Sequence, residues 1–386
     1  MNWIAQLSCF EVPRHANLLY VLGGVLLFAL CFQILTGLSM AIHYLPTTAS
    51  AFESINEFVR KFKYGWLVRS AHANGASLFF CALCFHVFRA VYYRSYIGSR
   101  KLVWMVGSAM YILALSISFM GLVLPWGQLS YWAAVVITNF VEAVPAAGKW
   151  IKLLVLGGFN IRDATLKRFF VFHCFLPFVV LFLAVLHVVL VHLATQNSPI
   201  PNRLPLYNSF VRMFPFFALK DTAFVFGYLL AICFLCLVVP NAFLNRHNHN
   251  PTNYYVTPTD IKPEWYFLPY YSVLRGFDSK PLGVVSVVSV LVFMVLLPYT
   301  HESLPSVVFK SFYKLFATAL FLSFSCLGIL GVFELGRYSD LVAKLCTAWC
   351  FAFSLCPFAN TCWRKLKLEI FKAKLVARLW IKALAN

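Results

Sequence analysis

The feature that most constrains this chain is a series of eight apolar runs, each close to the length of a membrane-spanning helix. A helix needs about 20 apolar residues to cross the hydrocarbon core of a bilayer. The runs contain few or no charged residues. We predict an all-α integral membrane protein with eight transmembrane helices, at residues 18–44, 70–92, 103–123, 169–192, 221–240, 283–298, 313–332 and 341–358.

The composition supports this class and raises a question about charge. Only 12% of the residues are charged, about half the share typical of soluble domains. The formal net charge is nevertheless +19. In a soluble protein such a charge would suggest nucleic acid, but here most of the basic residues lie in loops between spans or in the last 25 residues. We therefore expect lipid headgroups, cofactor carboxylates or a partner subunit as anionic partners, and no nucleic acid.

Two predicted spans each carry a pair of histidines 14 residues apart. His72 and His86 lie in the second span, and His173 and His187 lie in the fourth. At about 100° and 1.5 Å per residue, this spacing returns to nearly the same helix face after about 21 Å. Spans two and four run parallel, so the spacing predicts two bis-histidine sites stacked across the membrane. A hydrogen-bonded polar role is the alternative for a single intramembrane histidine, but four at matched spacing favour a common cause.

Haem is the ligand that two axial imidazoles favour, because it is large and flat. Zinc would prefer a tetrahedral set that includes cysteine or carboxylate, which these histidines lack. Glycines repeat the same interval in the first and third spans, at Gly23 and Gly37 and at Gly107 and Gly121. A glycine lets a porphyrin edge approach the backbone, although close helix packing through small residues is the alternative.

Two arginines bracket the histidines of the second span. Arg69 lies one turn before His72, and Arg89 lies three residues after His86. A guanidinium can bind a haem propionate through two charge-assisted hydrogen bonds. Anchoring at the headgroup level is the alternative for each arginine.

Three motifs carry a family resemblance: Gly-Trp-Leu-Val-Arg-Ser-Ala-His-Ala-Asn-Gly-Ala-Ser at 65–77, Leu-Pro-Trp-Gly-Gln at 124–128 and Pro-Glu-Trp-Tyr at 263–266. Together they resemble cytochrome b of the quinol–cytochrome c reductase (cytochrome bc1) complex, from about residue 10 to about residue 345. The resemblance implies a haem-binding four-helix part at 1–215 and a C-terminal part at 216–360. Residues 361–386 form a basic extension.

The resemblance also implies cofactors and their ligands. His72 and His173 would hold the iron of the low-potential haem b, and His86 and His187 would hold that of the high-potential haem b. Ubiquinol and ubiquinone would be the substrates.

A quinol-oxidation pocket is implied beside the first haem. Glu264 would accept a proton there, and Tyr271 would be a second polar contact. A carboxylate beside an apolar pocket suits proton transfer from a quinol hydroxyl. The structural alternative is a glutamate that anchors the loop after Pro263.

A quinone-reduction pocket is implied on the opposite side, with His192, Asp221 and Lys220. Alone, His192 would be an interfacial residue and Asp221 a helix cap. The family's acid after this histidine is replaced by Leu193, so the fine details of this pocket differ.

Another departure from the family pattern concerns inhibitors. Ala133 stands where the family has a glycine that lines the quinol-oxidation pocket, and Phe119 is implied as a second inhibitor-pocket residue. The added methyl group predicts reduced sensitivity to methoxyacrylate-type inhibitors with turnover preserved.

The two ends of the chain also depart from the family. The N-terminus leaves little room for an amphipathic surface helix before the first span. Residues 360–386 predict an amphipathic helix on an anionic membrane or partner, or a solvated tail. They contain seven basic residues, namely Arg364, Lys365, Lys367, Lys372, Lys374, Arg378 and Lys382.

The sequence therefore predicts the catalytic di-haem subunit of a proton-translocating quinol:cytochrome c oxidoreductase. Its implied partners are the Rieske iron–sulfur protein, cytochrome c1, the other subunits of a homodimeric complex III and lipids such as cardiolipin. The alternatives are a haem-free transporter or anchor with a histidine proton path, and a simpler two-haem anchor cytochrome b. We expect the mitochondrial inner membrane, with a bacterial plasma membrane as the alternative.

Overall fold

The computed structural model describes residues 11–13, 16, 18–194, 210–259, 261–301, 307–333, 336 and 338–355. Within these residues, seven helices are long and apolar enough to cross a membrane. The eighth predicted span is helical over residues 338–355. The prediction of an all-α membrane protein is confirmed, with helix boundaries within a few residues of those expected. The basic extension lies outside the described residues, as does most of the chain before the first span.

The first four spans form a bundle built from two packed helix pairs. Helix α2 (Leu22–Ala41) follows the short turn η1 (Leu18–Tyr20) and packs against α4 (Gly65–Tyr92). Helix α5 (Lys101–Val123) follows η2 (Gly98–Arg100) and packs against α8 (Asp163–Leu193). Contacts between α2 and α8 join the two pairs along one side.

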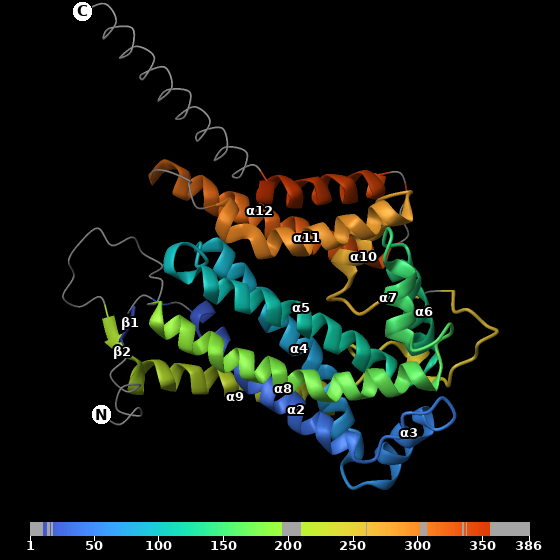
Figure 1. Cartoon of the computed structure of the whole chain (residues 1–386). Helices are drawn as coiled ribbons and strands as arrows, with labels where there is room; N and C mark the ends of the chain where they lie inside the picture. The colour runs from blue at the N-terminus through green and yellow to red at the C-terminus, as the bar shows by residue number, and fades with distance from the viewer. Residues whose placement is uncertain are drawn as a thin grey trace, which may run out of the picture.

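The remaining spans pack on this bundle from two directions (Figure 1). Helix α9 (Ala218–Leu237) packs against α4 and α2. Helices α11 (Lys280–Thr300) and α12 (Val307–Val332) contact α5 and α4 respectively. The short helix α10 (Leu268–Arg275) packs against both α11 and α12.

The long connections form helices of their own at one end of the bundle, where Figure 1 shows α3, α6 and α7. These are α3 (Ala51–Lys61), α6 (Gln128–Glu142) and α7 (Gly148–Leu156). Helix α3 is amphipathic, because Phe58 is buried while Glu57 and Lys61 form an exposed ion pair of 2.6 Å. The short helix η4 (Arg246–His249) packs against α6.

A small β-pairing lies at the other end of the bundle. Strand β1 (Glu11–Pro13) pairs antiparallel with β2 (Phe210–Arg212), and Val12 is opposite Val211. The π-helix η3 (Met213–Phe217) connects β2 to α9. This pairing joins the N-terminal segment to the start of the fifth span.

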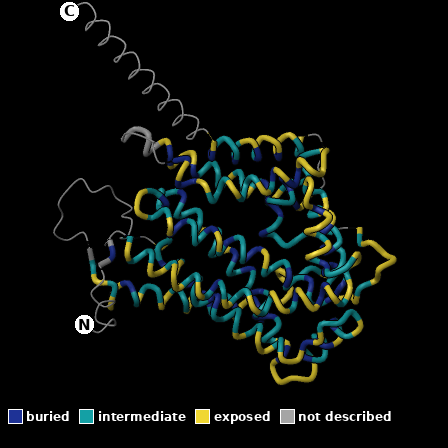
Figure 2. The backbone as a smooth tube through the Cα atoms, in the orientation of Figure 1, coloured by how far each residue is buried: buried dark blue, intermediate teal, exposed yellow. Residues whose placement is uncertain are grey.

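The surface of the spans is apolar, as a bilayer requires. Phe175 and Phe182 on α8 are 60% and 70% exposed. Figure 2 shows exposed residues on the outer faces of the helices and buried residues between them. So large an apolar surface marks contact with lipid or with other subunits.

Candidate functional site

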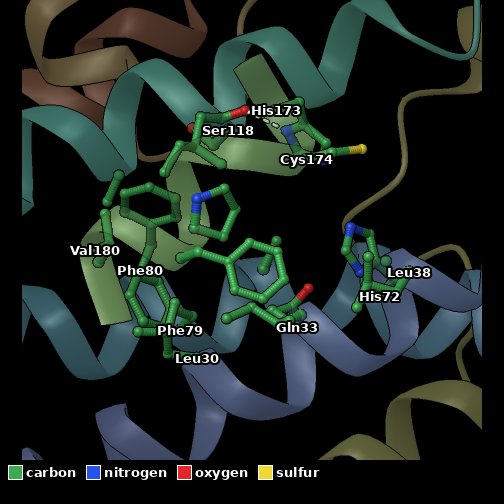
Figure 3. A pocket seen from close by; sticks show the side chains of 17 residues that line it. Leu30, Gln33, Leu38, His72, Phe79, Phe80, Ser118, His173, Cys174 and Val180 are labelled. Carbon is green, nitrogen blue, oxygen red and sulfur yellow. Dashed lines mark hydrogen bonds between the residues drawn. The ribbon is translucent and has the colours of Figure 1, made fainter. Parts of the chain in front are cut away.

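The first pair of histidines meets inside the four-helix bundle. The ring centroids of His72 on α4 and His173 on α8 are 6.2 Å apart, with an angle of 79° between the ring planes. The two rings lie on opposite walls of a cavity (Figure 3). Their separation leaves room for one metal ion bonded at about 2 Å to each ring.

The hydrogen bonds of these two rings leave a free nitrogen on each. His173 Nδ1 lies 2.8 Å from the carbonyl oxygen of Ile117, so Nδ1 carries the proton and donates. Thr36 Oγ1 donates to Phe32 O at 2.8 Å and therefore accepts from His72 Nδ1 at 3.0 Å. In both rings Nε2 keeps its lone pair. This tautomer is the one that metal-bound histidines normally adopt.

The four predicted glycines lie against the four histidine rings. A Cβ added at Gly121 would be 2.5 Å from His173 Cε1, and one at Gly37 would be 2.9 Å from His72 Cε1. The second pair has the same arrangement with looser contacts: Gly107 and Gly23 lie against the rings of His187 and His86, and an added Cβ would be 3.1 and 3.8 Å from Cε1. The absent side chains make room for the imidazoles themselves. The approach of a porphyrin edge stays a prediction.

The second pair lies further along the same two helices. His86 Nδ1 is buried and has no hydrogen-bond partner among the described residues. A buried polar nitrogen without a partner is costly. An imidazole with such an unpaired buried nitrogen suits a ligand-binding site.

The cavity between His72 and His173, here called the histidine cavity, has the shape and chemistry of a haem site. It is partly open and offers about 800 Å³ of space free of protein atoms, and its walls include Phe79, Phe80 and Pro177. No group of three or more His, Cys, Asp or Glu that could hold a metal ion occurs in the described part of the chain. The donor set is therefore two imidazoles in an apolar slot, which fits haem and not a protein-only metal centre.

A second cavity, here called the Glu264 cavity, continues from the first toward the end of the bundle that carries α3 and α6. It is partly open, offers about 1220 Å³ of space free of protein atoms, and is also lined by His72 and His173. Arg69 and Glu264 lie in its wall. The structure therefore brings the predicted proton acceptor and one predicted propionate ligand to the same histidine pair.

Burial sets the chemistry of Glu264. The cavity wall desolvates the carboxyl group and raises its pKa to about 7. The neighbouring Tyr266 stacks on Phe80 of α4, with ring centroids 4.0 Å apart and an angle of 11° between the planes. This stacking fixes the Pro-Glu-Trp-Tyr loop beside the helix that carries His72. A carboxyl group that titrates near neutral pH can accept a proton there.

A second segment closes the Glu264 cavity from the side of α6. Asn248 Oδ1 accepts hydrogen bonds from the backbone nitrogen and the hydroxyl of Ser130, at 3.0 and 2.9 Å. Thr252 Oγ1 donates to Trp126 O at 2.6 Å. These bonds fix the chain before Glu264 to the start of α6.

Arg89 lies at the second histidine pair. Its guanidinium carbon lies 3.6 Å from the ring centroid of Tyr20, and Nε is buried with no partner among the described residues. A desolvated guanidinium with an unpaired Nε suits an anionic ligand. The propionate role of Arg69 and Arg89 remains a prediction.

The remaining quinol-pocket candidates lie near the Glu264 cavity without lining it. Tyr271 stacks under Arg275, whose guanidinium carbon is 4.7 Å from the ring centroid. Ala133 is buried in α6, and Phe119 packs against Phe169. None of Tyr271, Ala133 and Phe119 is among the residues that line the cavity.

The candidates for quinone reduction lie at the opposite end. Asp221 packs against Gly24, where an added Cβ would be 3.3 Å from Oδ2, and Oδ1 is buried with no described partner. Lys220 donates to Ala16 O at 3.0 Å. His192 lies in the last turn of α8. Asp221 of α9 therefore packs against the residue of α2 that follows Gly23, the glycine that faces His86.

Sequence reasoning missed several residues that orient the site. Thr36 and the carbonyl of Ile117 fix the two histidine tautomers. Tyr111 and Tyr270 share a hydrogen bond of 2.7 Å between α5 and α10. A threonine directly before a predicted site glycine was an available signal for Thr36. A backbone carbonyl and a cross-helix tyrosine pair have no signal in a single sequence.

Comparisons with known proteins agree with this geometry. Residues 7–195 match the family model described as "Cytochrome b/b6/petB", and residues 251–351 match "Cytochrome b(C-terminal)/b6/petD". The chain is 40% identical to a cytochrome b of Acanthamoeba castellanii, over 82% of this chain and 81% of that protein. It is 38% identical to a cytochrome b of Rickettsia prowazekii, over 78% of this chain and 76% of that protein.

Two further matches are a longer protein and a chain of a solved complex. A protein of Bradyrhizobium diazoefficiens described as "Cytochrome b/c1" is 37% identical over 90% of this chain and 50% of its own length. A chain of a solved structure described as "Hyperthermophilic respiratory Complex III" superposes with a TM-score of 0.87 at 30% identity. This match covers 92% of the present chain and 94% of the other.

Proposed function

Because this chain belongs to the cytochrome b family and is the cytochrome b subunit of a quinol–cytochrome c oxidoreductase, we propose that it binds two b haems and carries both quinone sites. The observation that carries this proposal is the opposed His72 and His173 pair, with both Nε2 lone pairs free inside one apolar cavity. His86 and His187 would hold the second haem. The bound haems would supply one-electron carriers at two depths of the membrane.

The Glu264 cavity is the proposed site of quinol oxidation. Oxidation of a quinol to a quinone releases two electrons and two protons. Glu264 in its ionised form would take one of these protons, and its position beside the His72 pair puts the proton acceptor next to the electron route. One electron would pass to an iron–sulfur partner, and the other would pass to the haem held by His72 and His173.

The opposite end is the proposed site of quinone reduction. Asp221 and His192 would deliver the two protons that a quinone takes up with two electrons. The ammonium group of Lys220 would contact the quinone beside these two residues. Protons would thus be released on one side of the membrane and taken up on the other.

The proposed partners and location follow from the family. A Rieske iron–sulfur protein, cytochrome c1 and further subunits of a homodimeric complex III would surround the chain. The exposed apolar faces of α8 and α9 offer room for lipid and for such subunits. The proposed location is the mitochondrial inner membrane.

A visible spectrum of the purified complex after dithionite reduction tests the haem proposal. We expect two b-type components, and we expect His72→Ala and His86→Ala each to remove a different one. A complex without a Soret band would instead favour a histidine proton path without haem. Two haems without quinol–cytochrome c reductase activity would favour a simpler anchor cytochrome b.

A further inference from the structure

Helix α10 directly follows the loop at 263–266, here called the Glu264 loop. Phe267 N donates to Glu264 O at 2.8 Å, and this turn leads into α10 at Leu268. A shift of α10 would therefore be passed on to Glu264. The position of α10 thus influences how the proposed proton acceptor lies relative to His72 and His173.

The C-terminal half of α10 is bonded to α12. Ser272 Oγ donates to Leu327 O at 2.6 Å, and Arg275 Nη2 donates to Leu330 O at 3.0 Å. These bonds attach α10 to the last spans of the chain. The four histidines lie in the first four spans, so a separate contact must fix α10 relative to them.

A pair of tyrosines makes this contact. The hydroxyls of Tyr270 on α10 and Tyr111 on α5 lie 2.7 Å apart, and Tyr111 is only 6% exposed. Among the described residues, no other side-chain hydrogen bond joins α10 to the first four spans. A buried hydroxyl without a partner is costly, so each tyrosine holds the other in place. We call these two residues the tyrosine pair.

The same face of α5 packs against the Glu264 loop. One buried cluster joins residues of α4, α5 and this loop, namely Phe80, Tyr111, Ala114, Leu115 and Tyr266. Residues three and four apart lie on one helix face, so Ser118 continues the face of Ala114 and Leu115. Ser118 lines the Glu264 cavity. This face of α5 therefore runs from the tyrosine pair to the cavity wall.

Helix α5 also orients the first histidine pair. Ile117 O accepts the Nδ1 proton of His173, and Gly121 lies against the His173 ring. The tyrosine pair therefore bonds the helix that orients His173 to the helix that follows Glu264. Without this bond, α10 would keep its side-chain bonds to α12 and lose the one to α5.

We propose that Tyr111 and Tyr270 are positioning residues for quinol oxidation, because their bond sets the position of Glu264 relative to His72 and His173. This inference rests on the proposed role of Glu264 as proton acceptor. Neither tyrosine is among the residues that line the Glu264 cavity, so the pair acts through α10 and not on the quinol. Misplacement by about 1 Å can slow a reaction by about 10²-fold.

The test is the pH dependence of quinol oxidation by the purified complex. Tyr111→Phe and Tyr270→Phe each break the bond. A displaced loop would open the cavity wall to water, and a hydrated carboxyl group returns toward its ordinary pKa. We therefore expect the rise in rate to move to lower pH by about 0.5–1 unit. We also expect the rate per haem to fall roughly tenfold.

The variants leave the other titratable groups around Glu264 in place. The wall of the Glu264 cavity contains Arg69 and His72 of α4, His173 and Cys174 of α8, and Tyr44, His249 and Tyr266. None of these side chains is changed in either variant. Glu264→Gln, measured alongside, identifies the part of the pH profile that belongs to Glu264.

Tyr313→Phe is the matched control. It removes a buried hydroxyl that lies 2.7 Å from the hydroxyl of Tyr96. Tyr313 precedes Leu327 by 14 residues on α12, which is about 21 Å by helical rise. We expect this variant to keep the pH profile of the unmodified complex. Haem content and the reduced spectrum check that all variants are folded.

Three results would overturn the inference. If Glu264→Gln loses the rise with pH but both tyrosine-pair variants keep the unmodified profile, the inference fails and the proposed function stands. An equal shift in Tyr313→Phe would show that general loosening of the fold causes the effect. If Glu264→Gln keeps the rise, the proposed role of Glu264 fails and the inference fails with it.

Discussion

At the scale of single residues, the neighbours of each histidine decide what the histidine can do. Thr36 and Ile117 O accept the Nδ1 protons of His72 and His173, and this leaves Nε2 of each ring as a ligand atom. The glycines opposite these rings matter because they have no side chain. A methyl group at either glycine would occupy space that an imidazole now fills.

The first prediction concerns Gly121→Ala. The new Cβ would lie 2.5 Å from His173 Cε1, so the ring or the helix must shift, at a cost of about 1–3 kcal/mol for an overpacked core. We expect at least a fivefold loss of haem affinity at the first site, measured by haem content and by the reduced spectrum. Gly227→Ala is the matched control, because no atom lies within 4 Å of its Cβ position. Equal haem content in the two variants would contradict the prediction.

The second prediction concerns Glu264→Gln. With a pKa raised to about 7, the carboxyl group is protonated below pH 7 and accepts a proton only above it. Quinol oxidation by the unmodified complex should therefore rise between pH 6 and 8. The glutamine variant should lose this rise and about 10²-fold in rate.

Steady-state reductase rates across this pH range measure the effect of Glu264→Gln. Glu142→Gln on α6 is the control, since Glu142 is exposed and paired with Lys152. If the reductase rate of Glu264→Gln still rises over the same pH range, another group sets the pH dependence.

The third prediction concerns Ala133→Gly. The family pattern has a glycine here, and Ala133 is buried in α6. We expect the native complex to resist methoxyacrylate-type inhibitors and the glycine variant to become sensitive, with little change in uninhibited turnover. Inhibitor titrations of both proteins measure this difference. Nanomolar inhibition of the native complex would contradict it.

At the scale of helices, long apolar runs were the strongest signal in the sequence. The predicted span 169–192 corresponds to α8, and the span 103–123 corresponds to α5. The sequence did not show that α2 with α4 and α5 with α8 form two pairs around a cavity, because pairing depends on side-chain packing across helices. The connection between the third and fourth predicted spans folds into α6 and α7, which the apolar runs do not predict.

The candidate site also has a part that the sequence predicts and a part that it does not. The 14-residue spacing was sufficient to predict which histidines pair, because helix geometry fixes the depth of each ring. The Glu264 loop could be associated with this pair only through the family resemblance. Its placement depends on the stacking of Tyr266 on Phe80 and on the bonds of Asn248 to Ser130. Such contacts join segments far apart in the chain.

The fourth prediction tests the bond between α5 and α10. Tyr111→Phe or Tyr270→Phe alone leaves one buried hydroxyl without its partner, which costs about 1–3 kcal/mol. The double variant removes both groups and should be more stable than either single variant. Thermal unfolding of the four proteins measures the coupling between the two hydroxyls. Additive losses in the double variant would contradict a direct bond.

At the scale of the whole molecule, one buried cluster joins the haem-binding part to the last three spans. His301 follows α11, and Tyr96 lies between α4 and α5. Tyr96 OH lies 2.5 Å from His301 Nδ1 and 2.7 Å from Tyr313 OH of α12. His301 Nε2 donates to Phe353 O at 3.0 Å, in the helix at 338–355. The cluster therefore depends on a neutral imidazole that accepts at Nδ1 and donates at Nε2.

The fifth prediction follows from the protonation state of this cluster. Burial lowers the pKa of His301 to about 4, whereas the unfolded chain would titrate at about 6.5. The unfolded state therefore binds more protons between these values, and stability should fall by about 3 kcal/mol as the pH drops from 6.5 to 4. His301→Gln should be less stable at pH 7 but should lose less stability on acidification. Unfolding temperatures of both proteins across this range measure the difference, and parallel pH profiles would show that His301 does not link the two parts through its neutral form.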